Sequence, residues 1–289
     1  MSGNAWLVGL VVGAVACGPP PRNGAGDDDV VAPDASAPGG DGSGNGCAQG
    51  AESVYVIDHL LEHLFRFDPP TRSFTDLGQP FCPTSGKPFS MGVDRNAVAW
   101  LLYDTGELFE VQLNNALMCT KTTWASANGL HQFGMGFATD AAGGTTDSLY
   151  VGGGASQLAT TFTLAKLDTT TMTATTIGTT HQLPEMTGNA NAELWGFMPD
   201  AATPHVVKFD KTNGAVLVDF AEPSLAGANA GYAFAHWGGN YWVFLMKNSE
   251  PSTTVYEIDG TTGAIVDTIP TIRTIVGAGV STCAPTVLL

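Results

Sequence analysis

Three carboxylates stand where they could carry acid–base chemistry: Asp94, Asp140 and Glu185. Each lies on, or just after, a short small-residue segment that opens a repeated unit of the chain. Two carboxylic acids flanking one bond are the catalytic groups of most glycoside hydrolases. The same positions also begin turns, where Asp is common, and no enzyme motif surrounds them. We therefore predict no catalytic residue, and a hydrolase using these three carboxylates remains an alternative.

Residues 59–63 read His-Leu-Leu-Glu-His, which matches the H-x-x-E-H pattern of inverted zinc peptidases. That chemistry needs both histidines on one helical face, where the Glu activates a zinc-bound water. In this chain the segment lies between two strand-like runs, 54–57 and 64–68, which leaves room for a hairpin and not for a helix. Since C-x-x-C spacing is also absent, we predict no metal site.

Three further residues could contact a ligand through ring faces or an imidazole: His236, Trp237 and Trp124. His236 lies beside a small-residue strand and could face the mouth of a central channel, with a hydrogen-bonded packing histidine as the alternative. Trp237 and Trp124 stand in expected loops, and an indole offers a large apolar face with one polar N–H. We predict these three as candidate binding residues for a protein or a glycan.

The elements that position these residues come from a repeat. One pattern recurs: an apolar residue, any residue, a polar residue, an apolar residue, and then Asp, with Gln replacing Asp in the second copy. The copies occupy 64–68, 108–112, 164–168, 206–210 and 255–259. Their last positions advance by 44, 56, 42 and 49 residues. A period of this length is typical of propeller blades and other repeat architectures.

Each copy is flanked by further strand-like runs. An aromatic β-rich run precedes it, at 54–57, 98–101, 149–151, 194–197 and 241–244. A small-residue run comes earlier still, at 89–93, 133–137, 185–188, 232–235 and 276–280. A Thr/Val-rich run follows, as at 173–177. Units of four short strands predict an all-β, five-bladed β-propeller, and the weak run at 185–188 leaves six blades as an alternative.

The small-residue run is expected to be the innermost strand of each blade, since missing Cβ atoms allow close approach around an axis. Asp94, Asp140 and Glu185 would then gather near that axis. The first unit lacks such a run, whereas an extra one, 276–280, ends the chain. We therefore expect 276–280 to pair beside 54–57 and close the ring, which removes the open sheet edges.

The cysteines agree with this closure. Apart from Cys17 there are four, Cys47, Cys82, Cys119 and Cys283, and an even number in an exported chain indicates disulfides. Three pairings are possible. The expected seam places Cys47 and Cys283 close together, which leaves Cys82 to pair with Cys119. A seam disulfide over so long a loop would contribute roughly 4 kcal/mol in the chain-entropy account.

The turns at Asp210–Gly214 and Asp259–Gly263 resemble the repeats of quinoprotein-like and related bacterial propellers. Residues 47–285 as a whole resemble exported bacterial β-propeller lipoproteins. The quinone- and metal-binding residues of the quinoprotein enzymes find no counterpart in this sequence. The resemblance therefore implies a fold, and neither an activity nor a cofactor is carried over.

The N-terminal residues are typical of a secretion signal. An apolar run of twelve residues, 6–17, is too short to span a membrane and suits a secretory signal. It ends in Ala14-Val15-Ala16-Cys17, which resembles a bacterial lipobox and implies a lipid on Cys17 after cleavage. An ordinary signal peptide cut near Ala16 is the alternative. We expect a signal peptide at 1–17, a flexible Gly/Pro/Asp tether at 18–46 and the propeller at 47–289.

The net charge of the chain limits the classes of partner that we expect it to bind. The chain has 27 acidic and 11 basic residues and a net charge of -16, which disfavours nucleic acid. Gly18 follows the lipobox, so the Asp that retains some lipoproteins at the inner membrane is missing. The sequence predicts a monomeric lipoprotein, anchored at the outer membrane, its periplasmic face or the cell surface. Its propeller would be a non-catalytic binding or scaffold module for protein or glycan, and a structural envelope protein is a further alternative.

Overall fold

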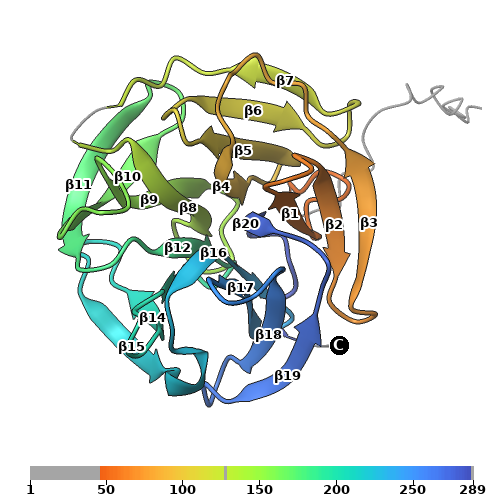
Figure 1. Ribbon diagram of the computed structural model, residues 1–289. Helices are drawn as coiled ribbons and strands as arrows, with labels where there is room; N and C mark the ends of the chain where they lie inside the picture. Colours follow the sequence, from red (N-terminus) through yellow and green to blue (C-terminus); the bar gives the residue numbers. More distant parts are fainter. Residues whose placement is uncertain (1–45, 127–128, 288–289) are drawn as a thin grey trace, which may run out of the picture. The chain divides into compact units, whose positions relative to one another are not determined.

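The computed structural model describes residues 46–126 and 129–287. The predicted signal peptide, Cys17 and nearly all of the tether lie outside the described residues. Within the described part, strands form five four-stranded antiparallel sheets around one axis (Figure 1). The five-bladed propeller expected from the repeat is thus confirmed, and the alternative of six blades is wrong.

In every blade the strands follow one another from the axis outward. Blade 1 has β20 (Ile275–Gly279), β1 (Val54–Asp58), β2 (Leu64–Asp68) and β3 (Ser73–Gly78). Blade 2 has β4 (Pro88–Val93), β5 (Val98–Tyr103), β6 (Leu108–Gln112) and β7 (Met118–Lys121). Blade 3 has β8 (Gln132–Thr139), β9 (Asp147–Gly154), β10 (Phe162–Asp168) and β11 (Thr173–Thr180). Blade 4 has β12 (Glu185–Gly188), β13 (Leu194–Met198), β14 (His205–Phe209) and β15 (Val216–Ala221). Blade 5 has β16 (Asn229–Trp237), β17 (Asn240–Lys247), β18 (Thr254–Asp259) and β19 (Ile265–Pro270).

The chain returns to close the ring in blade 1. Strand β20 pairs antiparallel with β1, with Tyr55 opposite Gly279 and Ile57 opposite Gly277. The C-terminal strand therefore supplies the inner strand that the first unit lacks, as the sequence predicted. Closure gives blade 1 the same four strands as the other blades, so that only short edges facing the axis and the rim remain.

Two disulfides accompany this closure. Cys47 is bonded to Cys283 across the seam, with Cα atoms 6.1 Å apart, and Cys82 is bonded to Cys119, with Cα atoms 5.2 Å apart. Both predicted pairings are confirmed. Disulfides persist in oxidising compartments, so the pair indicates an extracytoplasmic environment. Over the described ranges, no helix has the length and apolarity needed to cross a membrane.

The five inner strands all run in the same direction along the axis. A Cβ on Gly134 of β8 would meet Pro184 and Glu185, at the start of β12, whereas Gly188 at its end lies against Phe137 and Ala138. We call the face where the inner strands begin the start face, and the opposite face the finish face. The seam disulfide lies at the finish face, because Cys283 follows the end of β20.

Local sequence explains the turns between the outer strands. In the turn after β18, Oδ1 of Asp259 accepts N–H bonds from Thr261 and Thr262 at 3.1 and 2.7 Å. Gly263 then adopts φ +72°, which glycine accepts without a Cβ penalty. The turn from Asp210 to Gly214 is built in the same way.

The core lies between neighbouring blades. Phe67 of blade 1 packs edge-on against Trp242 and Phe244 of blade 5, with ring centroids 5.3 and 5.5 Å apart. All three side chains are buried. Edge-to-face aromatic pairs add roughly 0.5–1.5 kcal/mol beyond their buried area. Interblade packing of this kind holds neighbouring blades together.

Candidate functional site

The start face carries a cavity of about 440 Å³ on the propeller axis. All five inner strands contribute to its lining: Phe89 from β4, Gln132 from β8, Glu185 from β12, Tyr232 from β16 and Val276 from β20. In Figure 1 these strands lie around the centre of the ring. A cavity at the meeting point of all the blades, with polar groups converging on it, is the usual form of a ligand site.

Glu185 is the most unusual residue of this axial cavity. Its side chain is 2% exposed, and its Oε2 accepts a 3.0 Å hydrogen bond from the Ser90 hydroxyl of β4. Strand β8 of blade 3 lies between the strands that carry these two residues. The bond therefore spans the axis from blade 4 to blade 2. Glu185 forms the inner end of the axial cavity, away from its opening at the start face.

Glycine at position 134 makes this crossing possible. A Cβ placed there would lie 2.0 Å from the carbonyl oxygen of Pro184 and 2.8 Å from Cα of Glu185. Contacts that short would force β12 away from β8, since packed interiors have no room for an added carbon. The small-residue character of β8 thus positions the acid.

Burial raises the pKa of the Glu185 carboxyl well above its ordinary value of 4.5, and the hydrogen bond from Ser90 offsets this only in part. A carboxyl group in such a place favours its neutral form, because desolvation penalises the charge. Its second oxygen, Oε1, has no hydrogen-bond partner among the described residues. Glu185 therefore presents an unused polar atom to the axial cavity.

The rim of the axial cavity is polar and lacks positive charge. Asp104 is exposed there and accepts a 2.9 Å bond from the Lys87 backbone N–H. His59 also lines the cavity, and its Nδ1 is buried with no partner among the described residues. The Tyr232 hydroxyl is occupied, since it donates a 3.0 Å bond to the Leu183 carbonyl. No Lys or Arg of the described chain lines the axial cavity.

The structure does not bring the three candidate carboxylates together. Glu185 opens β12 at the start face, whereas Asp94 and Asp140 follow the ends of β4 and β8 at the finish face. Ser90, which bonds Glu185, is four residues before Asp94, or roughly 13 Å along an extended strand. The carboxylate spacing of glycoside hydrolases, at most about 9.5 Å, is not formed by this set.

Asp94 and Asp140 have structural partners instead. The Asp94 carboxylate accepts the Asn96 backbone N–H at 2.8 Å and the Trp100 indole N–H at 3.3 Å, while burial raises its pKa. Burial acts in the same direction on Asp140, but the Ser148 hydroxyl and Lys166 hold its pKa below the usual value. Both residues fix the turns that follow their strands.

Among the three predicted binding residues, His236 and Trp124 are packed in the interior. His236 is 4% exposed, its ring lies 5.7 Å from that of Tyr241, and burial lowers its pKa to about 4. Trp124 is 6% exposed and packs edge-on against Phe133 at 5.6 Å. Neither lines the axial cavity.

Trp237 does reach the surface, but at the finish face. It lines a separate groove of about 330 Å³ with Pro69, Arg72 and Trp242, between blades 1 and 5. Its indole N–H is already donated to the Glu52 carbonyl at 3.0 Å. The groove is mainly apolar, and the Arg72 guanidinium is held there by Glu257 and Asp267 at 3.0 Å each.

Residues 59–63 form a hairpin, as expected, and not a peptidase helix. His63 pairs with Asp76 at 3.0 Å, and Glu62 pairs with Lys87. Within residues 46–126 and 129–287, no group of His, Cys, Asp or Glu is arranged to hold a metal ion.

Sequence reasoning identified Glu185 but missed its neighbours. Ser90, Gln132 and Tyr232 all stand near the beginning of an inner strand. Since parallel inner strands bring their first residues to one face, a search of these positions alone would have found the set.

Neither a protein-family model nor a curated protein matches the sequence. Solved structures do match. The structure is similar to a chain of the nidogen/laminin complex, with 11% identity, a TM-score of 0.49 and coverage of 78% of this chain and 97% of that one. It is also similar to regucalcin, a calcium-binding protein of Agrobacterium tumefaciens, with 12% identity, a TM-score of 0.46 and coverage of 81% and 76%. A luciferin-regenerating enzyme matches with 11% identity, a TM-score of 0.45 and coverage of 78% and 75%. Likeness this distant carries none of these proteins' ligands or activities to this chain.

Proposed function

We propose that this chain is a cell-envelope lipoprotein whose propeller is a non-catalytic binding module with its ligand in the axial cavity. The observation that carries the proposal is a cavity of about 440 Å³ built by all five inner strands, into which a buried carboxyl group presents an unpartnered oxygen. Oε1 of Glu185 is not among the fully buried unpartnered atoms of the described residues, so it is open to the axial cavity, where a ligand can supply a partner.

Export and anchoring complete the proposal. The two disulfides support export. The described chain begins at residue 46, and Cys47 is bonded to Cys283 at the finish face. A lipid on Cys17 would hold the propeller at the membrane. Intact-mass measurement of the mature protein should show an acyl mass that Cys17→Ala lacks, and equal masses would reject the anchor.

A non-catalytic role is supported by the separation of the carboxylates. Glu185 has no second carboxylate opposite it at the start of another inner strand, and Asp104 at the rim is exposed. Two-carboxylate hydrolysis requires both groups to flank one bond. The arrangement favours holding a ligand over cleaving it.

Blocking the mouth of the axial cavity tests the proposal. Ala230 is exposed and lines the cavity, so Ala230→Trp should fill the opening without disturbing the core. Ala215, an exposed alanine in a finish-face turn, gives the matched control Ala215→Trp. The mature protein and both variants are screened against a glycan array and a library of small polar metabolites.

A ligand of the axial cavity should bind the wild type and Ala215→Trp but lose at least tenfold in affinity for Ala230→Trp. Ligands that bind both tryptophan variants equally would place binding elsewhere and overturn the proposal. So would a screen in which the folded wild type binds nothing.

A further inference from the structure

We propose that the ligand of the axial cavity is an organic cation, an amine or quaternary ammonium group, with Glu185 as its counter-ion. This inference rests on the proposed function and names its ligand class. It stands on three features of the axial cavity: the sign of its charges, the unpartnered oxygen of Glu185 and its aromatic lining.

The charges of the axial cavity are all of one sign. Its carboxyl groups are Glu185 at the inner end and Asp104 at the rim. Among the described residues, no Lys or Arg lines the cavity. The whole chain has a net charge of -16. A cleft lined by one sign of charge concentrates ligands of the opposite sign and repels anions. The cavity is thus unsuited to phosphate or carboxylate ligands.

The Glu185 carboxyl group offers a specific binding position for a positively charged group. It is 2% exposed, and the Ser90 hydroxyl binds Oε2 alone. A buried carboxylate is stable only when it is paired and hydrogen-bonded. A bound cation next to Oε1 would provide that pairing, whereas a water-filled cavity does not.

Two aromatic side chains, Phe89 and Tyr232, line the same cavity. Glu185 lines the cavity together with them. Aromatic faces attract cations, quaternary ammonium groups above all. A carboxylate with nearby ring faces is therefore better suited to an alkylated nitrogen than to a hydrated metal ion.

Binding of a cation must be coupled to a proton. The neutral Glu185 carboxylic acid would release its proton to water, and the carboxylate that remains would pair with the ligand nitrogen. Affinity for a cation should then rise with pH until Glu185 is ionised in the free protein. A neutral polyol, which would use the carboxylic acid as a donor, should show the opposite slope.

Other titratable groups face the same space and must be separated from Glu185. They are His59 from the β1–β2 hairpin, Asp104 from the loop after β5 and Tyr232 from β16. His59 places an imidazole in the same cavity, so His59→Asn is included as a variant. The slope assigned to Glu185 must persist in His59→Asn and vanish in Glu185→Gln.

Isothermal titration of the mature protein tests the inference with tetramethylammonium, choline and putrescine as probes. The neutral comparison is 3,3-dimethylbutan-1-ol, which replaces the choline nitrogen with carbon. Titrations run from about pH 6 to pH 9, in two buffers of different ionisation enthalpy, so that proton release is measured directly. Glu222→Gln is the matched control, because Glu222 is also a buried carboxyl group but does not line the axial cavity.

At least one cation should bind with a proton released, at least tenfold more tightly than the neutral isostere. Glu185→Gln should lose at least tenfold in affinity, and Glu222→Gln should match the wild type. Equal binding of choline and its neutral isostere, or no cation binding at about 10 mM, would overturn the cation assignment. A polyol or glycan that binds the wild type but not Ala230→Trp would then leave the proposed function standing.

Discussion

The Ser90 hydroxyl donates a 3.0 Å hydrogen bond to Glu185, and this bond joins blade 2 to blade 4 across the propeller axis. Most other contacts between blades join neighbours in the ring, although Thr282 after β20 also donates a 2.6 Å bond to Asp147 of blade 3. A link that skips a blade ties the start of β12 to the first half of β4 and fixes the inner end of the axial cavity. Among the described residues, this bond is the only hydrogen bond of the Glu185 carboxyl group. The protonation of Glu185 therefore affects the contact that fixes the inner end of the axial cavity.

Glu185→Gln should remove a pH dependence from the stability of the protein. The folded-state pKa of Glu185 lies well above its ordinary value of 4.5, so the folded chain binds the proton more tightly than the unfolded chain. Stability from this group is complete below about pH 4.5 and is lost as pH rises through the folded pKa, by about 1.4 kcal/mol per pH unit. Glutamine stays neutral, so its variant should lack this loss. Urea unfolding of both proteins across pH measures the difference.

A second buried acid must be separated in that experiment. Burial raises the pKa of Glu222 to about 7, so Glu222 adds a loss of stability with the same sign as pH approaches neutrality. The Glu222→Gln variant and the double variant separate the two contributions. Parallel stability curves for wild type and Glu185→Gln would show that the folded protein does not hold the Glu185 proton.

Most of the fold could be predicted from the sequence, because the strand pattern is local and recurs in every blade. The apolar-x-polar-apolar-Asp pattern predicted the third strand of every blade, and the missing first inner strand predicted that 276–280 pairs with 54–57. The seam disulfide followed from that closure. Even the weak run at 185–188 forms an inner strand, β12, because its neighbours in the ring determine its place.

The candidate site was harder to predict from the sequence, because it depends on the direction of each inner strand and on where each side chain packs. Asp94, Asp140 and Glu185 were grouped as residues near inner strands, yet two stand at strand ends and one at a strand start. That distinction places them on opposite faces. Trp124 was expected in a loop and available to a ligand, but its loop folds back so that the indole packs on Phe133. The sequence holds no periodic signal for such packing.

Removing the seam disulfide should cost more stability than removing the disulfide within blade 2. Cys47 and Cys283 are separated by 236 residues, whereas Cys82 and Cys119 are separated by 37. Longer loops lose more unfolded-state entropy on closure. The expected loss is about 5.5 kcal/mol for the seam disulfide, somewhat more than the rougher figure given from the sequence, and about 4 kcal/mol for the disulfide of blade 2. Two double Cys→Ala variants, unfolded in denaturant under oxidising conditions, give the comparison.

The seam variant has a second expected property, because the bridge secures the segment after β20. Hydrogen exchange at β20 and β1 should accelerate in the seam variant and stay unchanged in the Cys82/Cys119 variant. Equal protection of β20 in both variants would contradict a closing role for Cys47–Cys283.

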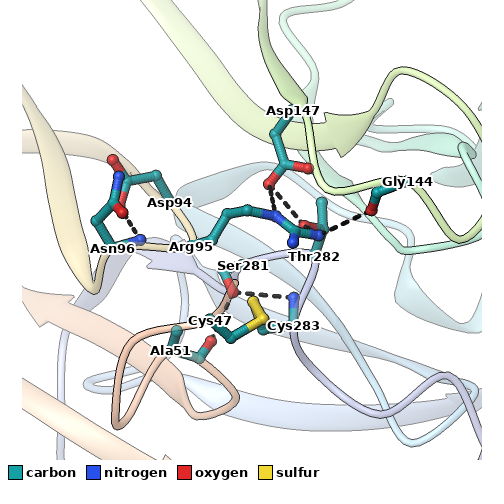
Figure 2. Close-up of a disulfide and its surroundings, with 10 residues drawn as sticks. All are labelled: Cys47, Ala51, Asp94, Arg95, Asn96, Gly144, Asp147, Ser281, Thr282 and Cys283. Carbon is teal, nitrogen blue, oxygen red and sulfur yellow. Dashed lines mark hydrogen bonds and ion pairs between the residues drawn. A yellow bond between two sulfur atoms is a disulfide. The ribbon is translucent and has the colours of Figure 1, made fainter. Parts of the chain in front are cut away.

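Arg95 at the finish face links three parts of the ring and should be important for stability. Its Nε lies 3.1 Å from Asp147 at the start of β9, and its guanidinium donates to the Gly144 carbonyl and the Thr282 hydroxyl at 3.2 and 3.1 Å (Figure 2). The side chains of Arg95 and Asp147 are only 12% and 5% exposed. Breaking a buried pair from one side leaves an uncompensated charge, which costs about 3–5 kcal/mol.

Arg95→Met should therefore destabilise the propeller by about 3–5 kcal/mol. The control is Lys166→Met, which removes an exposed pair 3.6 Å from Asp140 and should change stability by less than about 1 kcal/mol. Adding Asp147→Leu to Arg95→Met should recover part of the loss, because the stranded carboxylate is then gone. Equal denaturant midpoints for Arg95→Met and Lys166→Met, or no recovery in the double variant, would show that the buried pair does not hold the C-terminal segment to blades 2 and 3.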